Sequence, residues 1–447
     1  MSRFLSSLFA LTLLIGLLDS HPISVFLISL LLAFGGIHLC RNTEATGHVL
    51  AYKLLSIVSV VYILLAFLIS FVYREKQEIF IDCYSYIENL NLTQFDIDVN
   101  DFLIAGLVRL EDLNVLHEIG YRFFIIISNN YLDGASIFTL TYIHTIFGIF
   151  SSILVYRLML IFFNPHSSYK YTLTFALLSP FLVYSTVILR DIIIAFLYLL
   201  VFDIVLREFK ISRIVPILLI IILVTGCRLY SGLFLITFLL YYIYKGISHT
   251  KYANILIVVG AIVLFGIVSQ YVLGSDIMNQ SKEEIEGYVE YDADRSSGFS
   301  AKLAGLPTGA KELALSIYSQ VHPFPFYDLM KLAYNVPTFI LAIVKSISVL
   351  WWYFIFFGLC YALIIKNKLR AYNILDYMIF VIIAIYIVLN STQIDVRRIM
   401  AVYPLIYLYY IRSFDTLGSN IERRQCNRLL AGLYFSLLLV YIIFIQR

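Results

Sequence analysis

Long apolar segments recur along the whole sequence, and they constrain its fold more than any other feature. A helix that crosses the hydrocarbon core needs about 20 apolar residues, and fewer where it is broken or buried in protein. We expect spans over residues 4–18, 23–40, 54–73, 135–163, 171–188, 192–206, 214–226, 229–245, 252–273, 338–365, 375–391, 397–411 and 429–445. The pattern predicts an all-α fold, a polytopic transmembrane helical bundle of about 12 to 13 spans that forms a single integral membrane domain over 1–447.

Composition excludes a soluble domain. Hydrophobic residues make up 61% of the chain and charged residues 14%, whereas soluble domains contain about 25% charged residues. The net charge of +3 is small and no concentrated basic patch accompanies it, so we expect no nucleic-acid partner. The apolar stretch that follows Arg3 lacks a small-residue cleavage site, and we interpret it as a retained first helix.

The positions of Lys and Arg predict the orientation of the chain in the membrane. Short loops rich in these residues face the cytoplasm. Alternate loops carry such clusters: Arg41 and Lys53; Lys170; Arg207, Lys210 and Arg213; Lys245 and Lys251; Lys366, Lys368 and Arg370; Arg412, Arg423, Arg424 and Arg428. Two long loops, 74–118 and 274–337, then lie on the extracytoplasmic side, and we expect a short amphipathic helix over 308–320 in the second.

Four arginines break this pattern because they fall on the outer side. Arg190 occupies the turn within the apolar block 171–206, Arg228 the turn within 214–245, and Arg397 and Arg398 the outer end of a later span. The planar guanidinium group binds phosphate or carboxylate bidentately. One interpretation is a lipid-linked pyrophosphate held at the outer leaflet. The alternative is local ion pairing, of Arg190 with Asp191 or a loop acid and of Arg398 with Asp395.

Metal and nucleotide motifs are weak in this chain. The outer acids have no metal-ligand spacing, and the five cysteines are scattered, so we expect no metal and no cofactor. Asp96 and Asp98 form a DxD sequence, but it falls outside the cytoplasm, where nucleotide sugars are absent. His144 and Lys345 lie inside expected spans, where ionisable residues are candidates for function as well as for structural roles.

Four short motifs give the chain a resemblance to a known family. They are Glu118-Ile-Gly-Tyr121, Val187-Ile-Leu-Arg-Asp191, Cys227-Arg-Leu-Tyr-Ser231 and Asp395-Val-Arg-Arg398, the last followed by Pro404. Together with the outward arginines and the late outer loop, they resemble bacterial O-antigen polymerases and related exopolysaccharide polymerase membrane proteins, over roughly 118–405. Ile119 stands where relatives often have proline.

The resemblance implies an activity and a location. Such enzymes sit as multi-pass proteins in the bacterial inner membrane and act in polysaccharide and lipopolysaccharide biosynthesis. They transfer a glycan from undecaprenyl pyrophosphate to the non-reducing end of a new lipid-linked unit, as metal-independent glycosyltransferase-type polymerases. The implied partners are the undecaprenyl-pyrophosphate-linked oligosaccharide, membrane lipids and a chain-length regulator.

The implied reaction needs a base and fixed positive charge. Arg190, Arg228, Arg397 and Arg398 would bind the pyrophosphate. The candidate bases, in no fixed order, are Glu118, Asp191, Asp395 and His322.

Three other functions remain open from the residues. A GT-C-type glycosyltransferase that uses polyprenyl-phosphate sugars would place an acidic pair in the first outer loop, where Asp82, Asp96 and Asp98 lie. An O-antigen ligase also has a late outer loop with Arg and His. A lipid-glycan flippase or other transporter is the non-enzymatic alternative, although the two long loops and the lack of visible repeats argue against it.

Overall fold

The structure is a computed structural model that describes residues 1–19, 21–43, 47–74, 136–248, 336–366, 372–389, 396–415 and 420–444, with the single positions 307, 310, 314 and 417. All regular structure within these residues is helical. In chain order the elements are α1 (Ser2–Leu18), α2 (Pro22–Arg41), α3 (His48–Arg74), α7 (Ile137–Phe162), α8 (Pro165–Leu178), α9 (Pro180–Ser185), α10 (Arg190–Leu206), η3 (Ile211–Arg213), α11 (Ile214–Cys227), α12 (Leu229–Ile247), α18 (Val336–Cys360), η4 (Tyr361–Ile365), α19 (Ile374–Leu389), η7 (Val396–Ala401), α20 (Tyr403–Asp415) and α21 (Asn420–Phe444).

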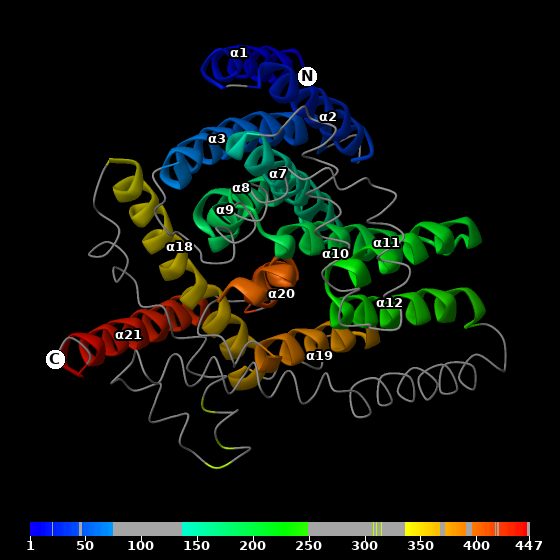
Figure 1. Cartoon of the computed structure of the whole chain (residues 1–447). Coiled ribbons are helices and arrows are strands. Elements are labelled where there is room, and N and C mark those ends of the chain that lie inside the picture. The colour runs from blue at the N-terminus through cyan, green and yellow to red at the C-terminus, as the bar shows by residue number, and fades with distance from the viewer. Residues whose placement is uncertain are drawn as a thin grey trace.

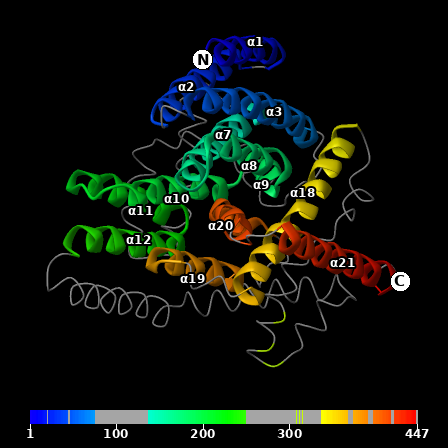
Figure 2. The same cartoon turned by 180° about the vertical axis from the view of Figure 1, so that it is seen from behind.

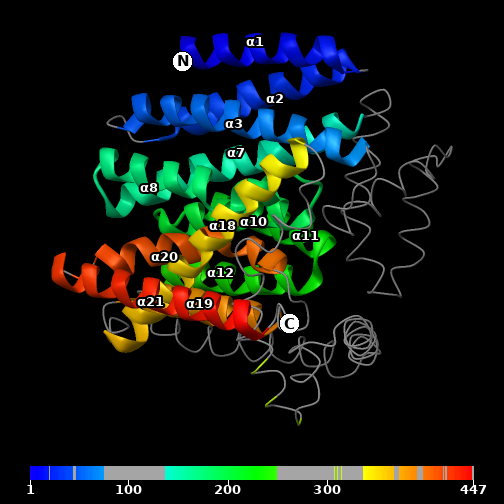
Figure 3. The same ribbon diagram turned by 90° about the vertical axis from the view of Figure 1, so that its left-hand side faces the viewer.

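The helices pack roughly in chain order. Figure 1 shows α1 to α3 at one edge, α7 to α10 in the middle, and α19 and α21 at the opposite edge; Figure 2 shows the same order from behind. Most of the labelled helices run along a similar direction in Figure 3, and α18 crosses them obliquely. This arrangement leaves α7 and α10 near the centre, where residues of the later helices can reach them.

Helix α7 is the centre of the core. Every residue from Phe138 to Met159 except Phe147 is buried, as expected of a helix that is apolar on all sides. It packs against α2, α3, α8, α9, α10 and α20. Gly148 allows the close approach of α9, because a Cβ at this position would lie 2.4 Å from Cβ of Ser185.

Local capping explains where several helices begin. The Ser136 hydroxyl accepts a hydrogen bond from Thr139 N–H (3.1 Å) at the start of α7, and the Asn164 side chain accepts one from Ser167 N–H (2.9 Å) at the start of α8.

The expected span 171–188 is divided between two helices, α8 and α9. Ser179 caps α9 by accepting from Phe181 N–H (3.3 Å), and Pro180 is the first residue of that helix, a position that proline favours.

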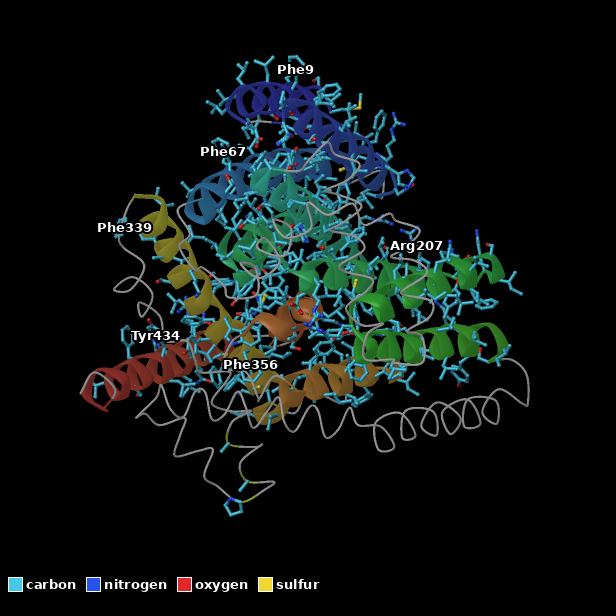
Figure 4. The ribbon with its side chains drawn as sticks, in the orientation of Figure 1. Phe9, Phe67, Arg207, Phe339, Phe356 and Tyr434 are labelled. Atoms are coloured by element: carbon cyan, nitrogen blue, oxygen red, sulfur yellow. The ribbon has the colours of Figure 1, made fainter. Side chains whose placement is uncertain are left out.

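The helices indicate a membrane protein. In the described part of the chain, Pro22–Arg41, His48–Ser70, Ile137–Phe162 and Ala342–Ile365 are long and apolar enough to cross a membrane, and several shorter apolar helices accompany them. Large apolar side chains also cover outer surfaces, such as Phe9 (65% exposed) at the edge of the molecule in Figure 4 and Ile222 (67% exposed) on α11. A surface of this kind is suited to lipid rather than to water.

Most expected spans have a helical counterpart. The expected span 397–411 divides into η7 and α20, and the one over 429–445 begins earlier, at Asn420. The expected span 252–273 and the loop 74–118 beyond its first residue lie outside the described residues. Within the expected amphipathic helix 308–320, Ala310 and Ala314 are described, and both are helical.

Ion pairs connect helices at the ends that carry the basic loops. Asp203 on α10 contacts Arg157 of α7 and Arg207, each at 2.9 Å. Asp376, in the first turn of α19, contacts Arg412 of α20 at 2.9 Å and accepts a hydrogen bond from Tyr409 at 2.5 Å. The first contact joins α7 to α10, and the second joins α19 to α20.

Candidate functional site

The first turn of α10 carries two of the residues that the sequence singled out. The connection from α9, residues 186–189, is not helical and is buried. Arg190 then begins α10 and Asp191 follows in its first turn. A carboxylate is stabilised at this place by the positive end of the helix dipole. Arg190 is partly exposed, whereas Asp191 is 1% exposed.

Arg228 is the single residue between α11 and α12. Its backbone is extended (φ −164°, ψ 112°), and it ends one helix and begins the other. Its N–H donates to Val224 O (2.7 Å), and its carbonyl accepts from Ser231 N–H (3.1 Å). One turn further, Gly232 packs closely on α11, since a Cβ there would lie 2.9 Å from Cα of Thr225. The root of the Arg228 side chain is therefore held by both helices.

The two turns meet in space. Nη1 of Arg228 lies 2.6 Å from Oδ1 of Asp191, and the two side chains are 3% and 1% exposed. Nη1 of Arg190 donates a long hydrogen bond (3.5 Å) to the carbonyl of Cys227, the last residue of α11. Arg190, Asp191 and Arg228 thus lie at one junction of α10, α11 and α12.

A buried hydroxyl network lies next to this junction. The Tyr198 hydroxyl of α10 donates to Ser231 O (2.8 Å), and Oγ of Ser231 lies 2.6 Å from the Tyr386 hydroxyl of α19. The two tyrosine hydroxyls are 3.4 Å apart. These contacts connect the first turn of α12 to α10 and α19. They hold α12, the helix that follows Arg228, in a fixed position.

The segment with the second arginine pair packs beside α10. Arg397 and Arg398 are in the short 3₁₀ helix η7, which contacts α9, α10, α19 and α20. Ile399 and Met400 in this segment are fully buried. The backbone of η7 is described, but the side chains of Arg397 and Arg398 are outside what the structure describes. Three elements that carry predicted arginines are thus brought together.

Three of the predicted bases lie outside the described residues: Glu118, His322 and Asp395. Asp191 is the candidate base that the structure does place. The alternative drawn from local spacing was an ion pair of Arg190 with Asp191 or with a loop acid, whereas the ion pair recorded for Asp191 is with Arg228, 37 residues later. Only the prediction that both turns lie on the outer side of the membrane pointed toward this contact.

Two further candidates from the expected spans lie in long apolar helices. His144 is fully buried in α7, and its Nδ1 lies 2.8 Å from the carbonyl of Leu140 in the preceding turn. Lys345 is in α18. Within the described ranges, no group of three or more His, Cys, Asp or Glu side chains is arranged to hold a metal ion.

Comparison with known proteins adds no identification. The chain matches no protein-family model, no curated protein and no solved structure at a significant level. What the site can do therefore follows from its chemistry. The turns that carry Arg190 and Arg228 meet at this junction, and guanidinium groups are suited to binding a phosphate-containing anion.

Proposed function

We propose that this chain is a polytopic enzyme of the bacterial inner membrane that polymerises lipid-linked oligosaccharide repeat units at the outer face. One observation carries the proposal. Arg190 and Arg228, which are 38 positions apart, meet at one junction, and the η7 segment that carries Arg397 and Arg398 packs against the same helix α10. A convergence of arginines fits a ligand with more than one negative charge, such as a lipid pyrophosphate.

The orientation of the helices supports an outer position for this junction. The opposite end of α10 carries Arg207, and the opposite end of α12 carries Lys245. These belong to the basic short loops that face the cytoplasm under the positive-inside rule. With thirteen spans, the junction and the two long loops 74–118 and 274–337 then share the extracytoplasmic side.

The proposed reaction transfers a growing glycan. A hydroxyl at the non-reducing end of a new lipid-linked unit attacks the anomeric carbon of the glycan held on undecaprenyl pyrophosphate. A new glycosidic C–O bond forms, the bond from the anomeric carbon to the pyrophosphate oxygen breaks, and undecaprenyl pyrophosphate leaves with the electron pair. A base accepts the hydroxyl proton.

Each group at the junction has a role in this scheme. The guanidinium groups stabilise the charge that grows on the departing pyrophosphate, and they do so without reorganisation because the helices fix them in advance. No metal ion is needed in this proposal. The candidate bases are Glu118, Asp191, Asp395 and His322, of which Asp191 is paired with Arg228.

Deleting the gene and identifying the lipid-linked products that accumulate would test this function. We expect complete single repeat units on the outer face and no polymer. Incomplete units would instead indicate a glycosyltransferase that builds the unit, and complete units confined to the inner face would indicate a flippase. Polymer that is formed but not attached to its final acceptor would indicate a ligase.

A further inference from the structure

An exposed stripe of side chains runs along α21, the helix at the edge of the molecule in Figure 1. Residues that follow one another at spacings of three and four lie on one side of a helix. On α21 such a series is exposed throughout: Ile421, Arg424, Arg428, Gly432, Phe435 and Leu439. We call these six residues the α21 stripe. It begins with two arginines and continues as an apolar surface into the expected span 429–445.

The two arginines of the α21 stripe have no acidic partner in the part of the chain that the structure describes. The neighbouring acids pair with other cations, Glu422 with Lys366 (3.4 Å) and Asp415 with Arg423 (3.1 Å). The arginines of the stripe are also four residues apart, and like charges at this spacing on a helix repel each other. A negatively charged ligand would relieve this repulsion.

The apolar part of the α21 stripe is open. A Cβ at Gly432 would meet no atom of the described residues within 4 Å, and Phe435 and Leu439 are 64% and 59% exposed. These two side chains follow Arg428 by a distance on the order of 10–17 Å along the helix axis, at a rise of about 1.5 Å per residue. One molecule with a phosphate and an acyl chain can therefore contact both parts of the stripe.

We propose that the α21 stripe binds an anionic phospholipid of the cytoplasmic leaflet, with the phosphate on Arg424 and Arg428 and an acyl chain along Gly432 and Phe435. The guanidinium fork is suited to phosphate oxygens. The basic loops predict that α21 begins on the cytoplasmic side, and the anionic lipids of that leaflet attract basic residues next to a span. The site lies on the side opposite the proposed polymerisation and does not depend on it.

The test titrates the purified full-length protein, in a neutral detergent, with phosphatidylglycerol or with phosphatidylcholine of the same acyl chains. Native mass spectrometry counts the bound lipids and gives the dissociation constant of the first one. Arg424→Gln/Arg428→Gln removes both charges of the stripe. Arg41→Gln/Lys53→Gln is the matched control, because it removes two exposed basic residues at the opposite edge of the molecule, on α2 and α3.

We expect the wild-type protein to bind phosphatidylglycerol in preference to phosphatidylcholine. Each basic residue near an anionic lipid surface contributes about a fivefold preference, so the stripe variant should bind phosphatidylglycerol about 25-fold more weakly. The control variant should bind it as the wild type does. The stripe variant should keep the wild-type melting temperature, because exposed side chains without protein partners contribute little to stability.

The proposal is wrong if the wild type binds the two lipids equally, or if the stripe variant keeps its affinity for phosphatidylglycerol. An equal loss in both double variants would show a response to net charge in place of a site, and would overturn it too. So would two other results. Displacement of the lipid by glycerol 3-phosphate would assign the arginines to a soluble phosphate compound. A mass of two chains that becomes one chain in the stripe variant would assign this face of α21 to a second copy of the protein.

Discussion

Replacing Arg190 with lysine keeps the positive charge at the start of α10 and removes the planar fork. In the structure, Arg190 is partly exposed and its Nη1 is 3.5 Å from the Cys227 carbonyl, at the limit of a hydrogen bond. Losing this contact costs at most about 1 kcal/mol of folding free energy. Losing a charge-assisted contact with pyrophosphate costs about 1.5–3 kcal/mol, which is roughly a ten- to hundredfold lower rate. The variant should therefore be folded but slow.

The same helix offers a matched control. Arg207 follows the last residue of α10, is 42% exposed and pairs with Asp203 at 2.9 Å. Because an exposed ion pair contributes at most about 1 kcal/mol and lysine can maintain it, Arg207→Lys should polymerise at the wild-type rate. Polymer length is read from glycan ladders in a deletion strain that carries each variant, and the protein level from immunoblots of its membranes.

Two outcomes would refute the reasoning about Arg190. A lysine variant with wild-type polymer would show that no bidentate contact is made there. An equal loss in the Arg190→Lys and Arg207→Lys variants, with less protein in the membrane, would show that the arginines of α10 serve the folding of the helix.

Three further predictions follow from the topology, the chemistry and the packing. Cysteines introduced at Asp98 and Asp292 should react with an impermeant reagent added from outside. Labelling only from the cytoplasmic side would contradict the predicted orientation of the chain in the membrane. Polymerisation by purified protein should persist in a chelator, and activity restored by Mg²⁺ or Mn²⁺ would contradict the proposed mechanism. Gly148→Ala should lower the free energy of unfolding by about 1–3 kcal/mol, because the new Cβ would lie 2.4 Å from Cβ of Ser185. Gly432→Ala is the control and should have no such effect, because a Cβ at this position would meet no atom within 4 Å. Equal melting temperatures of the two variants would argue against tight packing of α7 on α9.

Helix positions could be predicted because apolar length is a local property of the sequence. The expected span 192–206 differs from α10 by two residues at its start, and 214–226 differs from α11 by one at its end. The interruptions between consecutive helices are harder to predict from the sequence. The Ser179-Pro180 and Tyr403-Pro404 pairs lie inside continuous apolar runs. Pro180 is the first residue of α9 and Pro404 the second residue of α20, because proline lacks the N–H that a preceding turn would need.

The candidate site could be predicted only in part. The alternation of basic loops placed Arg190 and Arg228 at one end of their helices, and the structure joins these two turns. The pairing of Asp191 with Arg228 depends on how α10 and α12 are rotated about their axes, which the sequence spacing does not specify. The contact between Ser231 and Tyr386 joins residues 155 positions apart, and no local pattern indicates it.

The helix breaks lie where the arginines lie, and this coincidence bears on function. Backbone outside a helix at membrane depth needs protein partners, and it has them here: Thr186 N–H donates to Val183 O (3.1 Å), Arg228 N–H to Val224 O (2.7 Å) and Val402 N–H to Ile399 O (3.0 Å). Each break is followed by the start of a helix, namely α10, α12 and α20, whose N-terminal end carries partial positive charge. Under the proposed function, an anion bound beside the starts of α10 and α12 would gain from these helix ends as well as from the side chains.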